Sequence, residues 1–221
     1  MSASTHRRIP KERPKQIVDA ALAVFGEHGL AAARLDDIAK RAGLSKGTIY
    51  LYFSNKEELF QEVVRQTIAR LFERGEHDLS TTQRSATETL RRFIREYWSF
   101  IRSPEFAPLF RLIHGELYNF PDLVRFYVAE VITPARRLLT GMIRRGIESG
   151  EFRSVDPEVA ARMLTAPLVL HAVWCQHRDL FPWLAKKSDA TVLNELLRFY
   201  LPAIQMRPTP THRRRSAVPG A

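Results

Sequence analysis

The apolar residues of this chain recur with the period of an α-helix almost from end to end. No strand-like alternation lasts longer than four residues outside segments that also fit a helix. Leu90, Phe93, Ile94 and Tyr97, for example, share one helical face, and arginines largely occupy the others. Because 45% of the 221 residues are hydrophobic, such faces can bury a substantial core. We therefore predict an all-α protein.

Residues that start and stop helices divide this pattern into segments. Gly29 is placed to end the first helix, and Asn55 with Glu58 can form a capping box at the start of another. Asp156-Pro157 favours a helix start, whereas Pro134 should kink or restart the helix that contains it. The predicted helices span residues 10–28, 35–42, 45–52, 55–76, 87–102, 122–148, 157–174 and 189–205, and residues 78–86 form a polar loop.

The formal charge of +10 is concentrated at the two ends of the chain. Residues 1–15 and 207–221 each carry a net charge of +4, which leaves +2 for the body between them. Neither end has apolar periodicity, so we expect disordered basic arms that add affinity for phosphates without reading sequence. The alternative for the C-terminal segment is a solvated or cloning-derived tail.

Several classes of protein are disfavoured by what the sequence lacks. A single cysteine, Cys175, excludes an intramolecular disulfide and fits a reducing compartment. The longest apolar run, residues 163–175, is too short to cross a bilayer, and no signal peptide is evident. No GxSxG elbow, glycine-rich phosphate loop or HExxH motif indicates an enzyme. We therefore expect a cytoplasmic protein that is not an enzyme and does not associate with a membrane.

His171 and Cys175 lie four residues apart on one predicted helical face, a spacing that two metal ligands can share. The sequence offers no plausible third ligand for them. We therefore predict no metal site and no cofactor.

The segment from Leu35 to Phe53, LDDIAKRAGLSKGTIYLYF, has the spacing of a helix-turn-helix. Ile38 and Ile49 are apolar where the two helices must pack, and Gly43 lies at the turn, where a positive φ favours glycine. Ser45 can cap the second helix through the Thr48 amide. A turn between two short helices that never bind DNA is the alternative. The residues left near the N-terminus of the second helix, where a recognition helix enters the major groove, are Lys46, Gly47, Thr48 and Tyr50.

This segment and its flanks resemble the tetracycline-repressor (TetR) family of bacterial transcriptional regulators. The resemblance extends without gaps from Ile17 to Phe60. Residues 120–123 and 150–157 resemble AcrR-like members of the family more weakly. The matching positions before Phe60 are Ile17, Ala20, Ala21, Phe25, Gly29, Asp37–Ala39, Ala42–Tyr50, Tyr52–Phe53 and Lys56–Leu59.

The resemblance implies an N-terminal three-helix DNA-binding domain with a helix-turn-helix, followed by a C-terminal helical domain for ligand binding and dimerisation. We place the first domain at residues 16–60 and the second at 61–206, between basic arms at 1–15 and 207–221. In relatives the last two helices build the dimer interface. The predicted helix 157–174 is apolar almost all round, which independently favours a partner surface there.

The resemblance also implies particular DNA contacts. Tyr52 matches a position that touches DNA in some members, with helix packing as the alternative, and Lys56 matches a phosphate-contacting lysine. Many relatives have Thr or Ser before the second helix, where this chain has Ala33-Arg34, so Arg34 can supply that phosphate contact instead. The predicted DNA-binding set is Arg34, Ser45, Lys46, Gly47, Thr48, Tyr50, Tyr52 and Lys56.

The second domain is expected to hold an unidentified small-molecule effector. Its aromatic residues are candidates for the pocket, although aromatics at helical spacing also fit a plain core. Glu116 or His171 could orient a polar group of the ligand. The candidate set is Trp98, Phe106, Phe110, His114, Glu116, Tyr118, Phe126, Tyr127, His171 and Trp174.

These features together predict a homodimeric repressor that binds an inverted-repeat operator in double-stranded DNA and is released by its ligand. One alternative is a ligand-independent architectural DNA-binding dimer. Another is a basic protein that binds anionic membrane surfaces.

Overall fold

The computed structural model describes residues 13–81, 84–104 and 106–206. Residues 1–12 and 207–221 of the predicted arms lie outside this range, whereas residues 13–15 already belong to the first helix. The prediction of an all-α fold is confirmed, since the described residues contain a single isolated β-bridge besides helices. The α-helices are α1 (Arg13–Ala32), α2 (Leu35–Arg41), α3 (Lys46–Tyr50), α4 (Lys56–Thr81), α5 (Ala86–Ile101), α6 (Ala107–Gly115), α7 (Pro121–Tyr127), α8 (Thr133–Glu148), α9 (Pro157–Cys175) and α10 (Asp189–Ile204).

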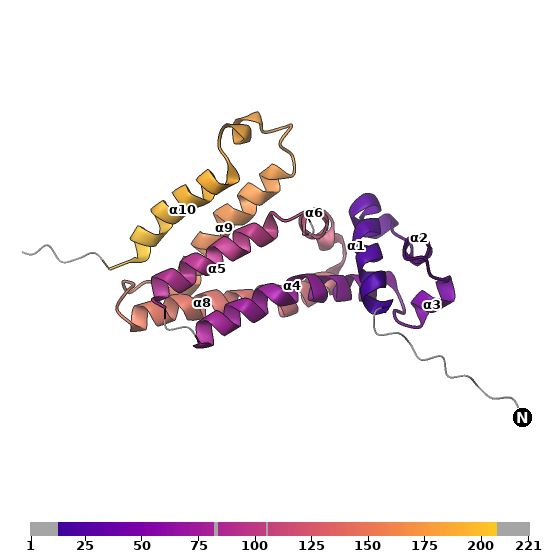
Figure 1. Cartoon of the computed structure of the whole chain (residues 1–221), viewed down its shortest axis with the longest axis horizontal. Coiled ribbons are helices and arrows are strands. Elements are labelled where there is room, and N and C mark those ends of the chain that lie inside the picture. The colour runs from indigo at the N-terminus through magenta and orange to yellow at the C-terminus, as the bar shows by residue number, and fades with distance from the viewer. Residues whose placement is uncertain (1–12, 82–83, 105, 207–221) are drawn as a thin grey trace, which may run out of the picture.

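The helices form two parts that share one long element (Figure 1). Helices α1, α2 and α3 gather at one end of the molecule, and the bundle of α5, α8, α9 and α10 extends away from them. Helix α4 begins beside α1 and then packs on α5 and α8. The boundary predicted between residues 60 and 61 therefore falls inside a continuous helix. The predicted end of this helix at residue 76 is also too early, because α4 continues to Thr81.

Local capping is as the sequence predicts, except that the Glu58 carboxylate binds the amide of Ser54 and not that of the N-cap residue Asn55. Gly29 has φ 76° and interrupts the last turn of α1, and Gly43 has φ 63° in the turn after α2. Asn55 Oδ1 accepts a hydrogen bond from the Glu58 amide at 2.7 Å, and the Glu58 carboxylate accepts one from the Ser54 amide at 2.8 Å. Asp156 caps α9 through two backbone amides. These side chains satisfy amides that the first turn of a helix leaves without a partner.

Pro134 restarts the helix that contains it, as predicted. A single π-helical turn, Val128–Ile132, separates α7 from α8, and Pro134 lies in the first turn of α8. Proline has no amide hydrogen to donate to the carbonyl four residues earlier, and its ring crowds that carbonyl. The wider turn accommodates this loss, and residues 122–148, predicted as one helix with a kink or restart at Pro134, form α7, the π-helical turn and α8.

Helix α6 was not among the predicted helices, although it forms the contact between the two parts of the molecule. It packs on α1 so closely that a Cβ at Gly26 would lie 2.7 Å from Cβ of Pro108. At the end of α6 the Glu116 carboxylate accepts hydrogen bonds from the amides of Leu30 at 2.9 Å and Ala31 at 3.3 Å. The last turn of α1 is therefore held by a residue of the helical domain.

The end of α10 is fixed by a short turn after α8. Phe152 is buried against Gly146, where no Cβ obstructs its ring. The turn then pairs with the end of α10: the Arg153 amide donates to the Ile204 carbonyl at 2.8 Å, and the Met206 amide to the Glu151 carbonyl at 2.9 Å. The position of α10 thus depends on the space above Gly146.

We predict that Gly146→Ala lowers the free energy of unfolding by about 1–3 kcal/mol, because the added methyl would overlap the Phe152 ring. Gly115→Ala is the matched control, since no atom lies within 4 Å of a Cβ built there. Urea denaturation followed by circular dichroism measures both. Equal stability of the two variants would contradict the packing described for Phe152.

Candidate nucleic-acid interface

The helix-turn-helix is built on a small buried contact. Ile38 of α2 and Ile49 of α3 are both fully buried, and Ala39 is buried where the helices approach. The Leu44 amide donates to the Ala39 carbonyl at 2.9 Å and closes the turn around Gly43. The predicted packing of this motif is confirmed.

Helix α3 presents its N-terminal end to solvent. Ser45 Oγ accepts a hydrogen bond from the Thr48 amide at 3.2 Å, which is the predicted cap. Ser45, Lys46, Gly47 and Tyr50 are exposed, and Thr48 is half-buried. Leu51, at the end of the helix, is 73% exposed. A protruding helix end with polar side chains and one glycine suits close approach to base edges.

Lys46 has an electrostatic partner within the domain. Its Nζ lies 2.8 Å from the Asp36 carboxylate and 5.9 Å from the centre of the Tyr50 ring. The hydrogen bond and the charge of Asp36 raise the pKa of Lys46, so this side chain is fully protonated at neutral pH. Both side chains of the pair are exposed, so the ion pair is weak and can be exchanged for a DNA contact.

Three other residues of the predicted DNA-binding set have different positions. Lys56 Nζ donates to the carbonyls of Ala31 at 2.6 Å and Ala33 at 3.4 Å, so it joins the end of α1 to the start of α4. Arg34 is exposed and precedes α2, and no side chain caps the start of that helix, where many relatives have Ser or Thr. The Tyr52 hydroxyl is buried without a hydrogen-bond partner, which favours helix packing for this residue.

The predicted ligand residues are spread over several places in the helical domain. Trp98, Phe106, Phe110 and Phe126 belong to the buried core. The His114 ring packs on that of Phe110, with 4.1 Å between the ring centres.

The remaining five candidates occupy different surroundings. Tyr127 is half-buried against the core, and Tyr118 is 81% exposed. Trp174 joins a cluster with Phe181 and Trp183 beyond the end of α9. Glu116 binds the amides of α1, so its carboxylate is engaged away from the aromatic set.

His171 stacks on Trp98 at 5.4 Å and belongs to a polar cluster with Cys175 and Asp189. Asp189 is the third potential metal ligand that the sequence did not reveal, because it lies at the start of α10. Both of its oxygens accept hydrogen bonds from guanidinium groups, one from Arg102 and one from Arg178. Burial lowers the pKa of His171, and the charge of Arg102 lowers it further. This cluster ties α5, α9 and α10 together.

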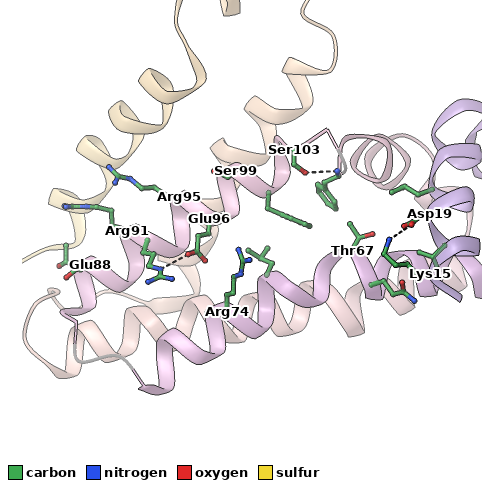
Figure 2. Close-up of a pocket in the computed structure, with 18 of the residues that line it drawn as sticks. Lys15, Asp19, Thr67, Arg74, Glu88, Arg91, Arg95, Glu96, Ser99 and Ser103 are labelled. Carbon is green, nitrogen blue, oxygen red and sulfur yellow. Dashed lines mark hydrogen bonds and ion pairs between the residues drawn. The ribbon is translucent and has the colours of Figure 1, made fainter. Parts of the chain in front are cut away.

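The surface of the described residues has two hollows whose positions the sequence did not predict. A groove of about 1240 Å³ lies between α1, α4 and α5 (Figure 2). Of the ten candidate ligand residues, Phe106 lines it. The sequence signal was the arginine series on α5, which by itself indicates only the polar face of an amphipathic helix. The second hollow, of about 910 Å³, is almost entirely apolar and lies between α9 and α10.

The apolar hollow agrees with the prediction that α9 exposes apolar residues beyond its own core. Met163 of α9 is 65% exposed and Phe199 of α10 is 83% exposed beside it. Surfaces of this kind mark contacts with other molecules more often than free solvent-facing surface. Within the described residues, no helix is both long and apolar enough to cross a membrane.

Both the N-terminal and the C-terminal part of the chain match known protein families. Residues 17–63 match the family described as bacterial regulatory proteins, tetR family, and residues 82–182 match the tetracyclin repressor-like C-terminal domain. The fatty acid metabolism regulator protein of Bacillus subtilis (strain 168) is 31% identical over 159 residues, which cover 71% of this chain and 80% of that protein. The HTH-type transcriptional repressor KstR2 of Rhodococcus jostii (strain RHA1) is 30% identical over 155 residues, covering 69% of this chain and 74% of the relative.

A solved structure shows the same fold. The transcriptional regulator FadR from Bacillus subtilis, crystallised in complex with stearoyl-CoA, superposes with a TM-score of 0.72 at 27% identity. The superposition covers 86% of this chain and 99% of that one. The N-terminal domain with the helix-turn-helix and the C-terminal helical domain are therefore both present, and the chain belongs to the TetR family of bacterial transcriptional regulators.

Proposed function

We propose that the protein is a homodimeric repressor that inserts α3 of each copy into the major groove of an inverted-repeat operator and is released by a small molecule. The observation that carries this proposal is the exposed N-terminal end of α3, which Ser45 caps and which is anchored in the core by the fully buried Ile49. A short helix held rigidly in this way keeps its side chains in a fixed register against base edges.

Each exposed residue of α3 has a chemical role in this proposal. Lys46 donates to O6 and N7 of a guanine or to a phosphate, after exchanging its Asp36 partner. Gly47 lets the backbone approach the DNA, and the Thr48 hydroxyl is a second donor near the groove. Tyr50 contacts a phosphate.

Two cations flank this helix in the proposed complex. Arg34 lies exposed at the start of α2, and Lys56 near the first turn of α4 has one ammonium hydrogen beyond the two that bind carbonyls. Phosphate contacts from these residues would position α3 without reading sequence.

The apolar face of α9 and α10 is the proposed dimer interface, with a second copy as its occupant. Its hollow is lined by apolar side chains of both helices, and Phe199 projects beside it. An interface on a two-fold axis is self-complementary, so Phe199 of one copy can enter the hollow of the other. Dimerisation would then place two α3 helices on one face of the DNA.

The contact of α6 with α1 is the proposed route from ligand to DNA. Glu116 follows α6, and its carboxylate holds the amides of Leu30 and Ala31. A ligand that shifts α6 would therefore rotate α1 and, with it, α2 and α3. Two conformations with different affinities for the ligand are sufficient for ligand binding to lower operator affinity.

Selection of DNA from a random library tests this proposal. An inverted repeat with half-sites about one helical turn apart, or about 10 base pairs, is the expected product. Sequence-independent binding that vanishes with salt would instead support an architectural DNA-binding dimer. A preference for vesicles of anionic lipid over DNA would contradict both.

We predict that Lys46→Ala and Tyr50→Ala each weaken operator binding by about 10-fold or more at moderate salt, because each removes a contact to base or phosphate. Fluorescence anisotropy with labelled operator measures the change. Lys40→Ala is the matched control: it removes the same charge from an exposed position on α2 and should leave affinity within about twofold. Unchanged binding by both α3 variants would contradict the assignment of α3.

We predict that Phe199→Asp converts the dimer to a monomer at micromolar concentration, because a charge would be buried in an apolar interface. Sedimentation equilibrium measures the oligomeric state. Val128→Asp introduces the same charge at an exposed apolar residue on the π-helical turn and should remain dimeric. A dimer that survives Phe199→Asp would place the interface elsewhere.

A further inference from the structure

Three side chains with different metal-binding atoms meet where α9 ends and α10 begins (Figure 1). His171 and Cys175 lie one turn apart at the end of α9, and Asp189 is the first residue of α10. A ring nitrogen of His171, the Cys175 sulfur and a carboxylate oxygen of Asp189 all lie within 4.8 Å of one another. The sequence indicated no third ligand for the two residues of α9, and α10 supplies one by folding back on that helix.

The two atoms from α9 have the separation that a tetrahedral metal requires. Nε2 of His171 lies 3.5 Å from Sγ of Cys175. Zinc bonds of about 2.0 Å to nitrogen and about 2.3 Å to sulfur place these atoms about 3.5 Å apart at a tetrahedral angle. The Asp189 carboxylate would complete three ligands by a movement of about 1 Å, and a water would fill the fourth position.

Arg178 holds the position of a cation between two of these ligands. Its Nη2 lies 2.9 Å from Asp189 Oδ1 and 3.6 Å from Cys175 Sγ. The Arg178 side chain is 43% exposed and follows the end of α9, so it can turn into solvent. Because ion pairs with this much exposure contribute little to stability, a metal that binds more tightly can take its place.

Arg102 of α5 holds the same carboxylate from the other side. It donates to Oδ2 of Asp189, the oxygen that does not face Arg178, and its side chain is only 18% exposed. Carboxylates that bind metals commonly accept such a hydrogen bond, which fixes their orientation. Arg102 can therefore stay in place when Oδ1 binds a metal.

The exchange of Arg178 for a divalent metal leaves the local charge unchanged. The metal brings two positive charges, the Cys175 thiol releases its proton to water and becomes a thiolate, and the departing guanidinium removes one positive charge. His171 binds as the neutral imidazole. The two arginines therefore do not exclude a metal from this cluster, because only Arg102 remains beside it.

We propose that His171, Cys175 and Asp189 form a site for a divalent transition metal of the Zn²⁺ and Co²⁺ class, and that Arg178 takes the place of the ion when no metal is bound. Imidazole and thiolate ligands favour these ions over Mg²⁺ and Ca²⁺, which prefer oxygen. The metal would join the end of α9 to the start of α10 across residues 176–188. This inference goes beyond the proposed function and does not depend on it.

Titration of the full, untagged chain with Co²⁺ under reducing conditions tests this site. Because Cys175 is the single cysteine of the chain, thiolate-to-cobalt charge-transfer absorption in the near ultraviolet arises from this cluster alone. We expect a saturable absorption of this kind, and its loss when excess Zn²⁺ is added. Zn²⁺ should also raise the melting temperature, because it binds the folded chain.

Four variants identify the ligands and test the role of Arg178. Cys175→Ser should abolish the charge-transfer absorption, and Asp189→Asn should weaken Co²⁺ binding by about 10-fold or more. Asp179→Asn is the matched control, since it removes the same charge from an exposed residue before α10 and should change binding by less than about twofold. Arg178→Gln should tighten Co²⁺ binding by about threefold or more, because the competing cation is gone. Thermal melting of each variant shows that it is folded.

Three outcomes would overturn the inference. A titration without charge-transfer absorption would show that any Co²⁺ bound lies at other histidines. Equal effects of Asp179→Asn and Asp189→Asn would show only a dependence on net charge. If Arg178→Gln bound Co²⁺ no more tightly than the parent chain, the cluster would be a set of ion pairs beside a thiol–imidazole hydrogen bond, in which Arg178 competes with no metal.

Discussion

The contact between α1 and α6 determines where the helix-turn-helix lies relative to the rest of the molecule. Because Gly26 has no side chain, the backbone of α1 lies close to Pro108 of α6. Just after Gly29, which has a positive φ, the Glu116 carboxylate accepts hydrogen bonds from the amides of Leu30 and Ala31. Lys56 binds the carbonyls on the other side of the same turn. The end of α1 is therefore held by the helical domain through its amides and by α4 through its carbonyls. Because close-packed helices shift between discrete arrangements and do not deform continuously, this is the place where a change in the helical domain can reach α3.

The net charge of the protein suggests a nucleic-acid partner, but it does not locate the site. Most of the surplus lies in the two terminal segments, and the body is nearly neutral. Within the DNA-binding domain, α3 contributes one lysine, which Asp36 already pairs. In the proposed complex, recognition by this surface would depend on shape and on the capped helix end, whereas the terminal segments would add affinity that does not depend on sequence.

Local signals made the fold largely predictable. The positive φ of Gly43, the caps at Ser45, Asn55 and Asp156, and the restart at Pro134 each depend on residues within a turn of one another. The geometry of the candidate site was predictable where it is local, as in the Ser45 cap of α3. Contacts between distant segments were not: Leu30 and Glu116 are 86 residues apart, and Asp189 meets His171 only because α10 folds back on α9. The groove was missed for the same reason, since its walls come from three helices and each one separately looks like an ordinary amphipathic surface.

We propose that the α1–α6 contact and the apolar face of α9 and α10, as the dimer interface, together fix the distance between the two α3 helices of a dimer. The most direct test is operator affinity as a function of the spacing between half-sites, measured with a series of duplexes that differ by one base pair. Adding two base pairs rotates one half-site by about 70° relative to the other. The account predicts a sharp affinity maximum at one spacing and a loss of about 10-fold or more at two base pairs on either side. Affinity that does not depend on spacing would contradict it, because the two α3 helices would then bind independently.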